Sequence, residues 1–114
     1  MGLFGKKKNE YEEASKNLNQ TELASDRVIT EELTDDDQRA AALVTSLKNG
    51  CPLILNFDNL EPMAANKLLA FFAGACFALD GRSVKINEKI YLFARKADFF
   101  DGSLKELIDS IPRG

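Results

Sequence analysis

The chain has 114 residues, of which 45% are hydrophobic and 29% are charged, and this length fits a single small domain. It contains no histidine and no tryptophan, so the commonest general base and the commonest transition-metal ligand are both absent. The longest apolar run, residues 68–79, is shorter than the roughly 20 residues that span a bilayer. Cys51 and Cys76 fit no zinc-binding spacing, and we expect them to be buried thiols in a reducing compartment. Composition therefore argues against histidine-dependent catalysis and against a membrane-spanning helix in this sequence.

The formal net charge of −3 is distributed unevenly along the chain. Residues 1–8 carry three lysines and no acid, residues 9–37 carry ten acids against two bases, and residues 38–114 carry ten bases and eight acids. This division predicts three parts: a basic and apolar tip over 1–8, which reaches residue 18 if its apolar stripe continues, an acidic flexible tether over 9–26, and a folded domain over 27–114.

The tip combines apolar side chains with a lysine cluster: Met1, Leu3, Phe4, Lys6, Lys7 and Lys8. Such a segment is typical of binding to an anionic membrane surface, where each lysine contributes about 1 kcal/mol. The alternative is a solvated N-terminus without a partner. A signal peptide is not expected, because no apolar h-region follows the lysines.

The folded domain is predicted from apolar periodicity and from turn and cap residues. In chain order we expect a strand over 27–30, a helix capped by Thr34 or Asp35 and ended by Asn49-Gly50, a buried central strand over 51–57, a helix from Pro62 to about Leu79, strands over 82–86 and 89–94 joined by a tight hairpin at Asn87-Glu88, and a short helical pattern after Phe99-Phe100. The order β-α-β-α-β-β predicts a small α/β sandwich with two helices on a mixed sheet.

The second helix is apolar around its whole circumference over residues 68–79. A helix that packs on a sheet needs only one apolar face. If the sheet covers Leu68, Phe72, Ala75 and Leu79 or a neighbouring stripe, another apolar stripe is left over. Ala70, Gly74 and Ala78 place small residues along one side, where another backbone can approach closely. The hypothesis is self-association through this helix, and the alternative is that the first helix or the C-terminal segment covers it.

Taken together, residues 27–95 resemble the SepF family of bacterial cell-division proteins, the membrane anchors of the tubulin-like protein FtsZ. The resemblance is carried by Pro52, Asn56-Phe57, Glu61-Pro62, Gly74-Ala75, Ala78-Leu79-Asp80-Gly81, Lys85-Ile86 and Ile90-Tyr91-Leu92. The tip MGLFGKKK is similar in character to the family's membrane-targeting end. The tail from Asp98 to Gly114 has no counterpart in this comparison, and a divergent paralogue with another partner stays open.

The resemblance implies a homodimer that binds the FtsZ C-terminal peptide at the inner face of the cell membrane and supports septum formation, without a cofactor or metal. It implies that the helix glycine at Gly74 takes part in the subunit contact, and that Lys85 and Tyr91 hold the FtsZ peptide. From the residues alone, Lys85 alternates with Val84 and Ile86 and so points off the opposite face of the sheet. A lysine beside an aromatic ring suits an acidic, partly apolar peptide. The alternatives are a solvated strand lysine and a core aromatic.

Three other functional classes compete with a membrane-anchored adaptor. An enzyme is disfavoured because no glycine-rich phosphate loop or nucleophile elbow is present, and the acids of Asp35-Asp36-Asp37 point in different directions on a helix. Nucleic-acid binding is disfavoured because a nearly neutral domain behind an acidic tether repels phosphate. A soluble homodimeric interaction module without a membrane role is the remaining alternative, and residues 1–8 decide between it and a membrane anchor.

Overall fold

The computed structural model describes residues 22–112. The predictions made for Met1, Leu3, Phe4, Lys6, Lys7 and Lys8, and for the tether up to residue 21, lie outside these residues. The described elements are η1 (Ala24–Arg27), β1 (Ile29–Glu32), α2 (Asp37–Lys48), β2 (Leu53–Asn56), α3 (Pro62–Ala78), β3 (Gly81–Lys85), β4 (Ile90–Arg95), η2 (Lys96–Phe99) and α4 (Ser103–Asp109). The predicted α/β class and the order β-α-β-α-β-β are confirmed.

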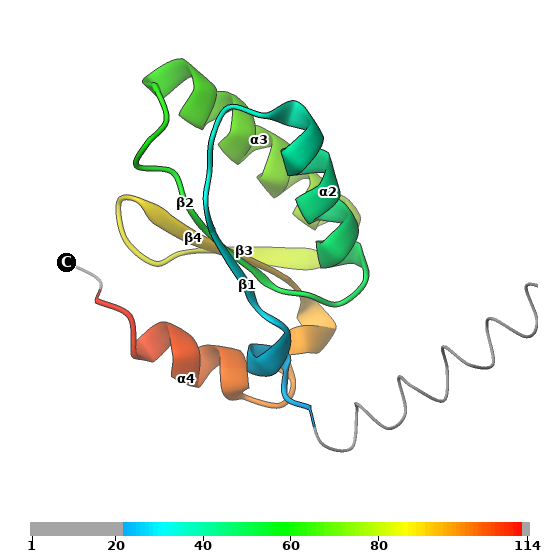
Figure 1. Ribbon diagram of the computed structural model, residues 1–114. Coiled ribbons are helices and arrows are strands. Elements are labelled where there is room, and N and C mark those ends of the chain that lie inside the picture. The colour runs from blue at the N-terminus through cyan, green and yellow to red at the C-terminus, as the bar shows by residue number, and fades with distance from the viewer. Residues whose placement is uncertain (1–21, 113–114) are drawn as a thin grey trace, which may run out of the picture.

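The four strands form one mixed sheet in the order β1-β2-β4-β3. β1 is parallel to β2, as a connection through α2 requires, whereas β2–β4 and β4–β3 are antiparallel. Helices α2 and α3 cover one face of this sheet and α4 covers the other (Figure 1). The sandwich therefore has a third layer, which the prediction of two helices on a sheet did not include.

β2 is the central strand, and its residues Leu53, Ile54 and Leu55 are at most 6% exposed. Burial on both faces explains why this segment is apolar at consecutive positions rather than at alternate ones. Pro52 precedes the strand, where its missing N–H costs nothing, and its carbonyl oxygen accepts a hydrogen bond from the Ile29 N–H at 2.9 Å. β1 begins two residues later than predicted, at Ile29.

α2 is capped by Asp36, whose side chain accepts a hydrogen bond from the Arg39 N–H at 3.0 Å. The prediction that Thr34 or Asp35 caps this helix is therefore wrong by one or two residues. The helix ends as expected at Asn49 and Gly50, and Gly50 has a φ of +97°, in the left-handed region that glycine adopts most readily.

α3 begins with Pro62 in its first turn and leads into β3 through a tight connection at Asp80 and Gly81. A Cβ atom on Gly81 would lie 2.6 Å from Cys76 Sγ and 2.7 Å from the Ala94 carbonyl oxygen. Only glycine leaves room for this close approach of strand to helix. Cys76 is buried, as predicted, and burial raises the pKa of its thiol, whereas Cys51, also predicted to be buried, is only partly buried.

Each face of the sheet has its own apolar core. The helical face joins residues of α2, α3, β2 and Phe93, and the other face joins Ile54, Leu92, Ile86 and Ile108. Ile108 comes from α4, in the C-terminal segment for which the sequence offered no role. This segment therefore closes the second face of the sheet.

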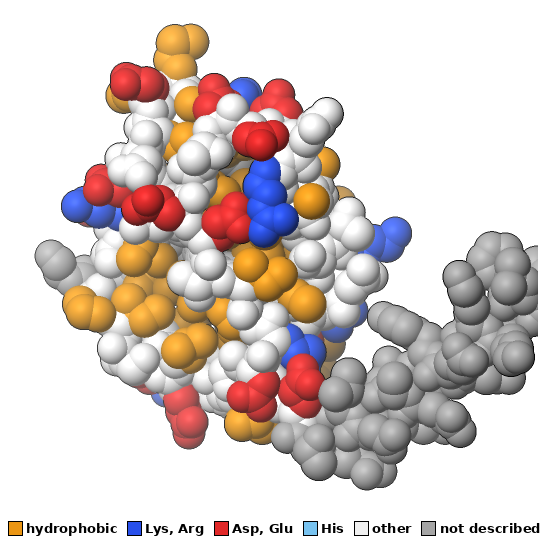
Figure 2. Space-filling model, viewed as in Figure 1, with side chains coloured by type: hydrophobic (Ala, Val, Ile, Leu, Met, Phe, Trp, Pro, Cys, Tyr) orange, Lys and Arg blue, Asp and Glu red, His pale blue; other side chains and the backbone are white. Residues whose placement is uncertain are grey.

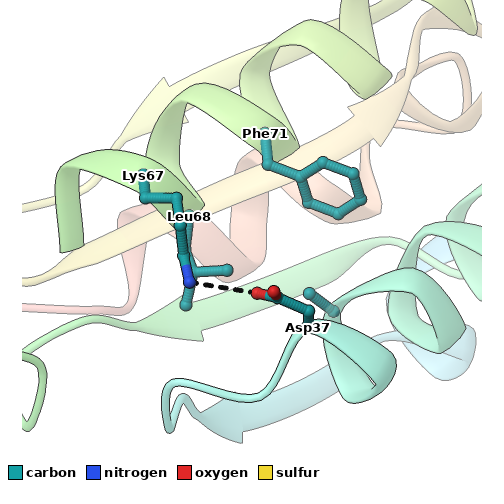
Figure 3. A pocket seen from close by; sticks show the side chains of 5 residues that line it. Asp37, Lys67, Leu68 and Phe71 are labelled. Atoms are coloured by element: carbon teal, nitrogen blue, oxygen red, sulfur yellow. Dashed lines mark ion pairs between the residues drawn. The ribbon is translucent and has the colours of Figure 1, made fainter. Parts of the chain in front are cut away.

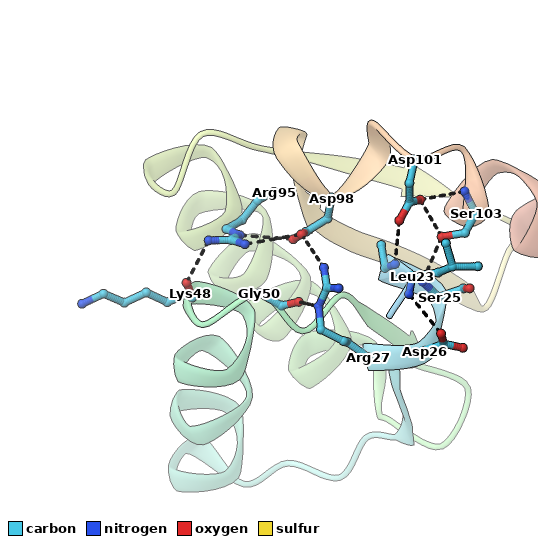
Figure 4. Close-up of polar contacts among 11 residues, drawn as sticks. Leu23, Ser25, Asp26, Arg27, Lys48, Gly50, Arg95, Asp98, Asp101 and Ser103 are labelled. Atoms are coloured by element: carbon cyan, nitrogen blue, oxygen red, sulfur yellow. Dashed lines mark hydrogen bonds and ion pairs between the residues drawn. The ribbon is translucent and has the colours of Figure 1, made fainter. Parts of the chain in front are cut away.

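Polar contacts join the two ends of the described chain (Figure 4). Asp98 is 5% exposed and pairs with Arg27 at 2.9 Å and with Arg95 at 3.1 Å. Asp101 accepts the Ala24 N–H at 2.8 Å, and the Ser103 hydroxyl accepts the Ser25 N–H at 3.0 Å. The packed domain thus includes residues 24–26, which the sequence analysis placed in the tether.

Candidate protein-interaction site

Lys85 and Tyr91 lie directly opposite each other on β3 and β4. Cross-strand neighbours point to the same face of a sheet, so the two side chains share one face. Val84 and Ile86 contact the apolar core on the α4 side, and Tyr91 packs against the core on the helical side. The predicted orientation of Lys85, opposite to Val84 and Ile86, is confirmed, and it places Lys85 on the side of α2 and α3.

The two residues have different environments. Tyr91 is partly buried, with its ring edge-on to Phe57 at 5.4 Å and nearly parallel to Phe93 at 6.3 Å between centroids. Lys85 is half exposed, and its Nζ lies 3.3 Å from a carboxylate oxygen of Glu88. The pair therefore offers a fixed aromatic surface beside a cation whose only ion pair in the described chain is exposed and weak.

The hairpin loop that carries Lys85 is held by Asn87. Its side-chain oxygen accepts the N–H groups of Lys89 at 2.8 Å and Ile90 at 3.0 Å, and its amide donates to the Pro112 carbonyl oxygen at 3.1 Å. The Ile86 N–H bonds the Ile90 carbonyl oxygen, so the turn contains residues 87–89 rather than the predicted two. Hydrogen bonds of Asn87 thus hold the turn next to Lys85 to the start of β4 and to Pro112.

The second predicted surface is the outer face of α3. Leu68, Phe72 and Cys76 are at most 2% exposed and fix the face that packs on the sheet. The expected stripe differs by one position, since Cys76 rather than Ala75 is fully buried. Ala70, Gly74 and Ala78 lie on the opposite, exposed side. A Cβ atom on Gly74 would meet no atom within 4 Å, so nothing in the described chain covers this glycine.

Three large apolar side chains border these small residues and were not singled out from the sequence. Met63 is 86% exposed, Phe77 is 84% exposed and Phe71 is 42% exposed. In a helix that is apolar all round, the sequence cannot say which residues face outward. Once Leu68, Phe72 and Cys76 are known to face the sheet, the 100° rotation per residue places Phe71 and Phe77 on either side of Gly74.

The outer face of α2 continues this surface. Its exposed positions between the first and last turns are Ala41, Ala42 and Thr45. The outward side of α2 thus carries charges near its ends and none in the middle, whereas the outward side of α3 carries one charged residue, Lys67, on the same side of the helix as Gly74. Exposed apolar side chains grouped in this way mark contact surfaces.

Between 22 and 112, no group of three or more His, Cys, Asp or Glu residues is arranged to hold a metal ion. Within the same range, no helix is long and apolar enough to cross a bilayer.

The described domain is a small three-layer α/β fold with a lysine-aromatic pair on its hairpin and exposed apolar side chains on α3. The profile of the family described as "Cell division protein SepF" matches residues 28–96, more than half of the chain. The chain belongs to the SepF family of cell-division proteins.

Similar curated proteins carry the same description. The chain is 38% identical over 69 residues to "Cell division protein SepF" of Alkaliphilus oremlandii, an alignment that covers 60% of this chain and 47% of that protein. It is 33% identical over 67 residues to the protein of the same description from Carboxydothermus hydrogenoformans, covering 59% and 49%. It is 45% identical over 47 residues to "Cell division protein SepF 2" of Desulforamulus reducens, covering 41% and 29%. The chain thus spans about half the length, or less, of these relatives.

Proposed function

We propose that this protein is a cell-division adaptor that self-associates and tethers FtsZ filaments to the cytoplasmic membrane, in support of division-ring assembly and septum formation. The observation that carries the proposal is membership of the SepF family over residues 28–96. Three parts of the chain serve three steps: the hairpin binds the FtsZ tail, the outer helical face binds a second copy, and residues 1–8 bind anionic lipid.

The hairpin suits an acidic peptide that also carries an apolar side chain. Lys85 supplies the positive charge, and the exposed edge of Tyr91 supplies an apolar contact that is already held in place by Phe57. The ion pair between Lys85, at the end of β3, and Glu88, in the turn three residues later, is solvent-exposed, so a carboxylate of a partner can replace Glu88 at small cost.

Titration of the full chain with an acidic FtsZ C-terminal peptide tests this step. We expect Lys85→Glu to weaken binding at least tenfold, because it reverses the charge at the site and places it beside Glu88. Lys105→Glu is the matched control, since Lys105 is likewise exposed and paired with an acid of its own element. Absence of binding to the natural sequence, or equal losses in both variants, would contradict the assignment of Lys85 and Tyr91.

The exposed area of α3 alone is too small for a stable interface between two copies. A helix of 17 residues is about 25 Å long and about 10 Å wide, so its footprint is about 250 Å². A stable interface buries about 800 Å² on each partner. The exposed small residues of α2 therefore join Ala70, Gly74 and Ala78 in the proposed contact, together with Met63 and Phe77.

The membrane step depends on residues 1–8. Three lysines near an anionic surface contribute about 3 kcal/mol, and insertion of Leu3 and Phe4 adds to this. Co-sedimentation of the full chain with anionic vesicles, compared with a chain lacking residues 1–8, tests the role of the tip. Equal pelleting of both chains would favour a homodimeric interaction module without a membrane role.

A further inference from the structure

A shallow apolar pocket opens between the N-terminal ends of α2 and α3. Its volume is about 230 Å³, and its walls are Ala40, Leu68 and Phe71, with Asp37 and Lys67 at the rim (Figure 3). Phe71 projects from α3 toward the first turn of α2 and stays 42% exposed. The pocket is thus an open apolar surface that the domain does not fill by itself.

Asp37 and Lys67, the two charged residues that line the pocket, form an ion pair at 3.0 Å, and we use the term acidic rim for the wider group of acids at this end of the domain. The acids at this end of the domain, where β1 ends and α2 and α3 begin, are Glu31, Glu32, Asp35, Asp36, Asp37 and Glu61. Two bases accompany them in the described chain: Arg39 is paired with Glu31 at 2.9 Å, and Lys67 is paired with Asp35 at 2.6 Å and with Asp37 at 3.0 Å. The net charge of this group is −4, and Figure 2 shows acidic side chains gathered at that end of the molecule. The positive ends of the two helix dipoles offset only about one unit of it.

We propose that residues 1–8 of the same chain dock on this pocket, with Leu3 and Phe4 against Leu68 and Phe71 and with the lysines against the acidic rim. The tip carries a charge of +3 and its only large apolar side chains are Met1, Leu3 and Phe4. Its chemistry therefore complements an apolar pocket within an acidic rim as well as it complements an anionic membrane.

The length of chain outside the structure permits this contact. Eighteen residues lie between Phe4 and Leu23, which makes nineteen steps from one Cα atom to the next and a reach of at most about 60 Å. The longest dimension of the molecule is 48 Å, so the tip can reach any point of the domain surface. The average end-to-end distance of a flexible chain of 19 residues is about 25 Å, which keeps the tip at a high local concentration around its own domain.

This contact regulates the proposed membrane anchor. A tip bound to the pocket is withheld from lipid, and the apparent dissociation constant for vesicles rises by the reciprocal of the undocked fraction. Anionic lipid and the acidic rim then compete for the same lysines. The consequence for membrane binding rests on the proposed function, whereas the docking itself is measured without lipid. An experiment can therefore refute the docking without refuting the proposed function, and the reverse.

The absence of tryptophan from the sequence allows a direct test in the full chain. A Phe4→Trp substitution introduces a single reporter, and its emission in dilute protein is compared with that of a free peptide of residues 1–8 that carries the same change. We expect a blue shift and protection from acrylamide in the full chain, independent of protein concentration. Both effects should be lost in 0.5 M NaCl, where the screening length falls to about 4 Å.

Matched variants locate the contact. In the reporter chain, Phe71→Ala and Asp37→Lys should each remove most of the blue shift, whereas Phe100→Ala and Asp109→Lys should leave it unchanged. Phe100 is an 84% exposed phenylalanine just before α4 and Asp109 an exposed acid at the end of α4, the helix that covers the opposite face of the sheet from the pocket. Emission equal to that of the free peptide, or equal losses in test and control variants, would overturn the proposal. A blue shift that grows with protein concentration would also overturn it, because the tip would then dock on a second copy.

Discussion

The same substitution, glycine to alanine, should have opposite effects on stability at two positions seven residues apart. At Gly81, the added methyl group would lie 2.6 Å from Cys76 Sγ, 2.7 Å from the Ala94 carbonyl oxygen and 2.9 Å from the Cys76 carbonyl oxygen. Two of these three atoms belong to the backbone and cannot rotate away. Overpacking of this kind costs about 1–3 kcal/mol, and we expect the upper end for Gly81→Ala.

At Gly74, the added methyl group meets no atom within 4 Å. Gly74 lies inside α3, where alanine is favoured over glycine by about 1 kcal/mol. Gly74→Ala should therefore raise the free energy of unfolding of the monomer by about 1 kcal/mol. The glycine is unfavourable for the isolated fold, which is consistent with the proposed contact of a second copy at this face, where a bare backbone allows close approach.

Urea unfolding at a concentration below that of self-association measures both effects. With a slope of about 2 kcal/mol/M, Gly74→Ala should raise the midpoint by about 0.5 M and Gly81→Ala should lower it by more than 1 M. Gel filtration at high concentration should show weaker self-association of Gly74→Ala. A midpoint for Gly74→Ala below that of the natural sequence would refute the reasoning, because it would mean that the domain itself covers this glycine.

Three further outcomes follow from the described contacts. Asp98→Ala leaves two arginines without the buried carboxylate that they share, and it should lower the free energy of unfolding by about 3 kcal/mol in thermal denaturation. Asp101 accepts three hydrogen bonds, from the Ala24 N–H and from the backbone N–H and hydroxyl of Ser103, and these hold its pKa below the usual 3.8. The stability that they contribute is present above pH 3.8 and is lost as the pH falls through the lowered pKa. Asp101→Asn should therefore flatten the pH dependence of the unfolding free energy below about pH 4. Phe77→Ser should reduce self-association in analytical ultracentrifugation without loss of monomer stability, because Phe77 is 84% exposed in the monomer.

The order of elements was predictable because it depends on local periodicity. Alternation and apolar runs identified all four strands, and Gly50 and Pro62 marked the end of α2 and the start of α3. The cap of α2 was misplaced because Thr34, Asp35 and Asp36 are all good cap residues, and the end of β1 decides among them. Within such a run, residue type alone carries no information about the boundary.

The third layer could not be predicted, because it depends on contacts between residues far apart in the sequence. Ile108 packs against Ile54 and Leu92 on the sheet face away from α2 and α3. No local sequence pattern predicts which face of a sheet a short helix covers. The outward positions of α3 were hidden for the same reason. The face of Lys85, by contrast, followed from the strict two-residue period of a strand, since a strand has only two faces.

The three layers also determine on which side of the sheet each proposed contact lies. η1, from which the chain leads toward residues 1–21, packs beside α4 on one side of the sheet, whereas α2, α3 and the Lys85–Tyr91 pair lie on the other. The described chain thus begins beside α4, on the face of the sheet away from the proposed interaction surfaces. Under the proposed function, self-association through α3 would join two tips in one particle, and the second tip would bind at the high effective concentration set by the first. A modest affinity of one tip would then be sufficient for anchoring in the associated state, so the exposed face of α3 would contribute to membrane binding.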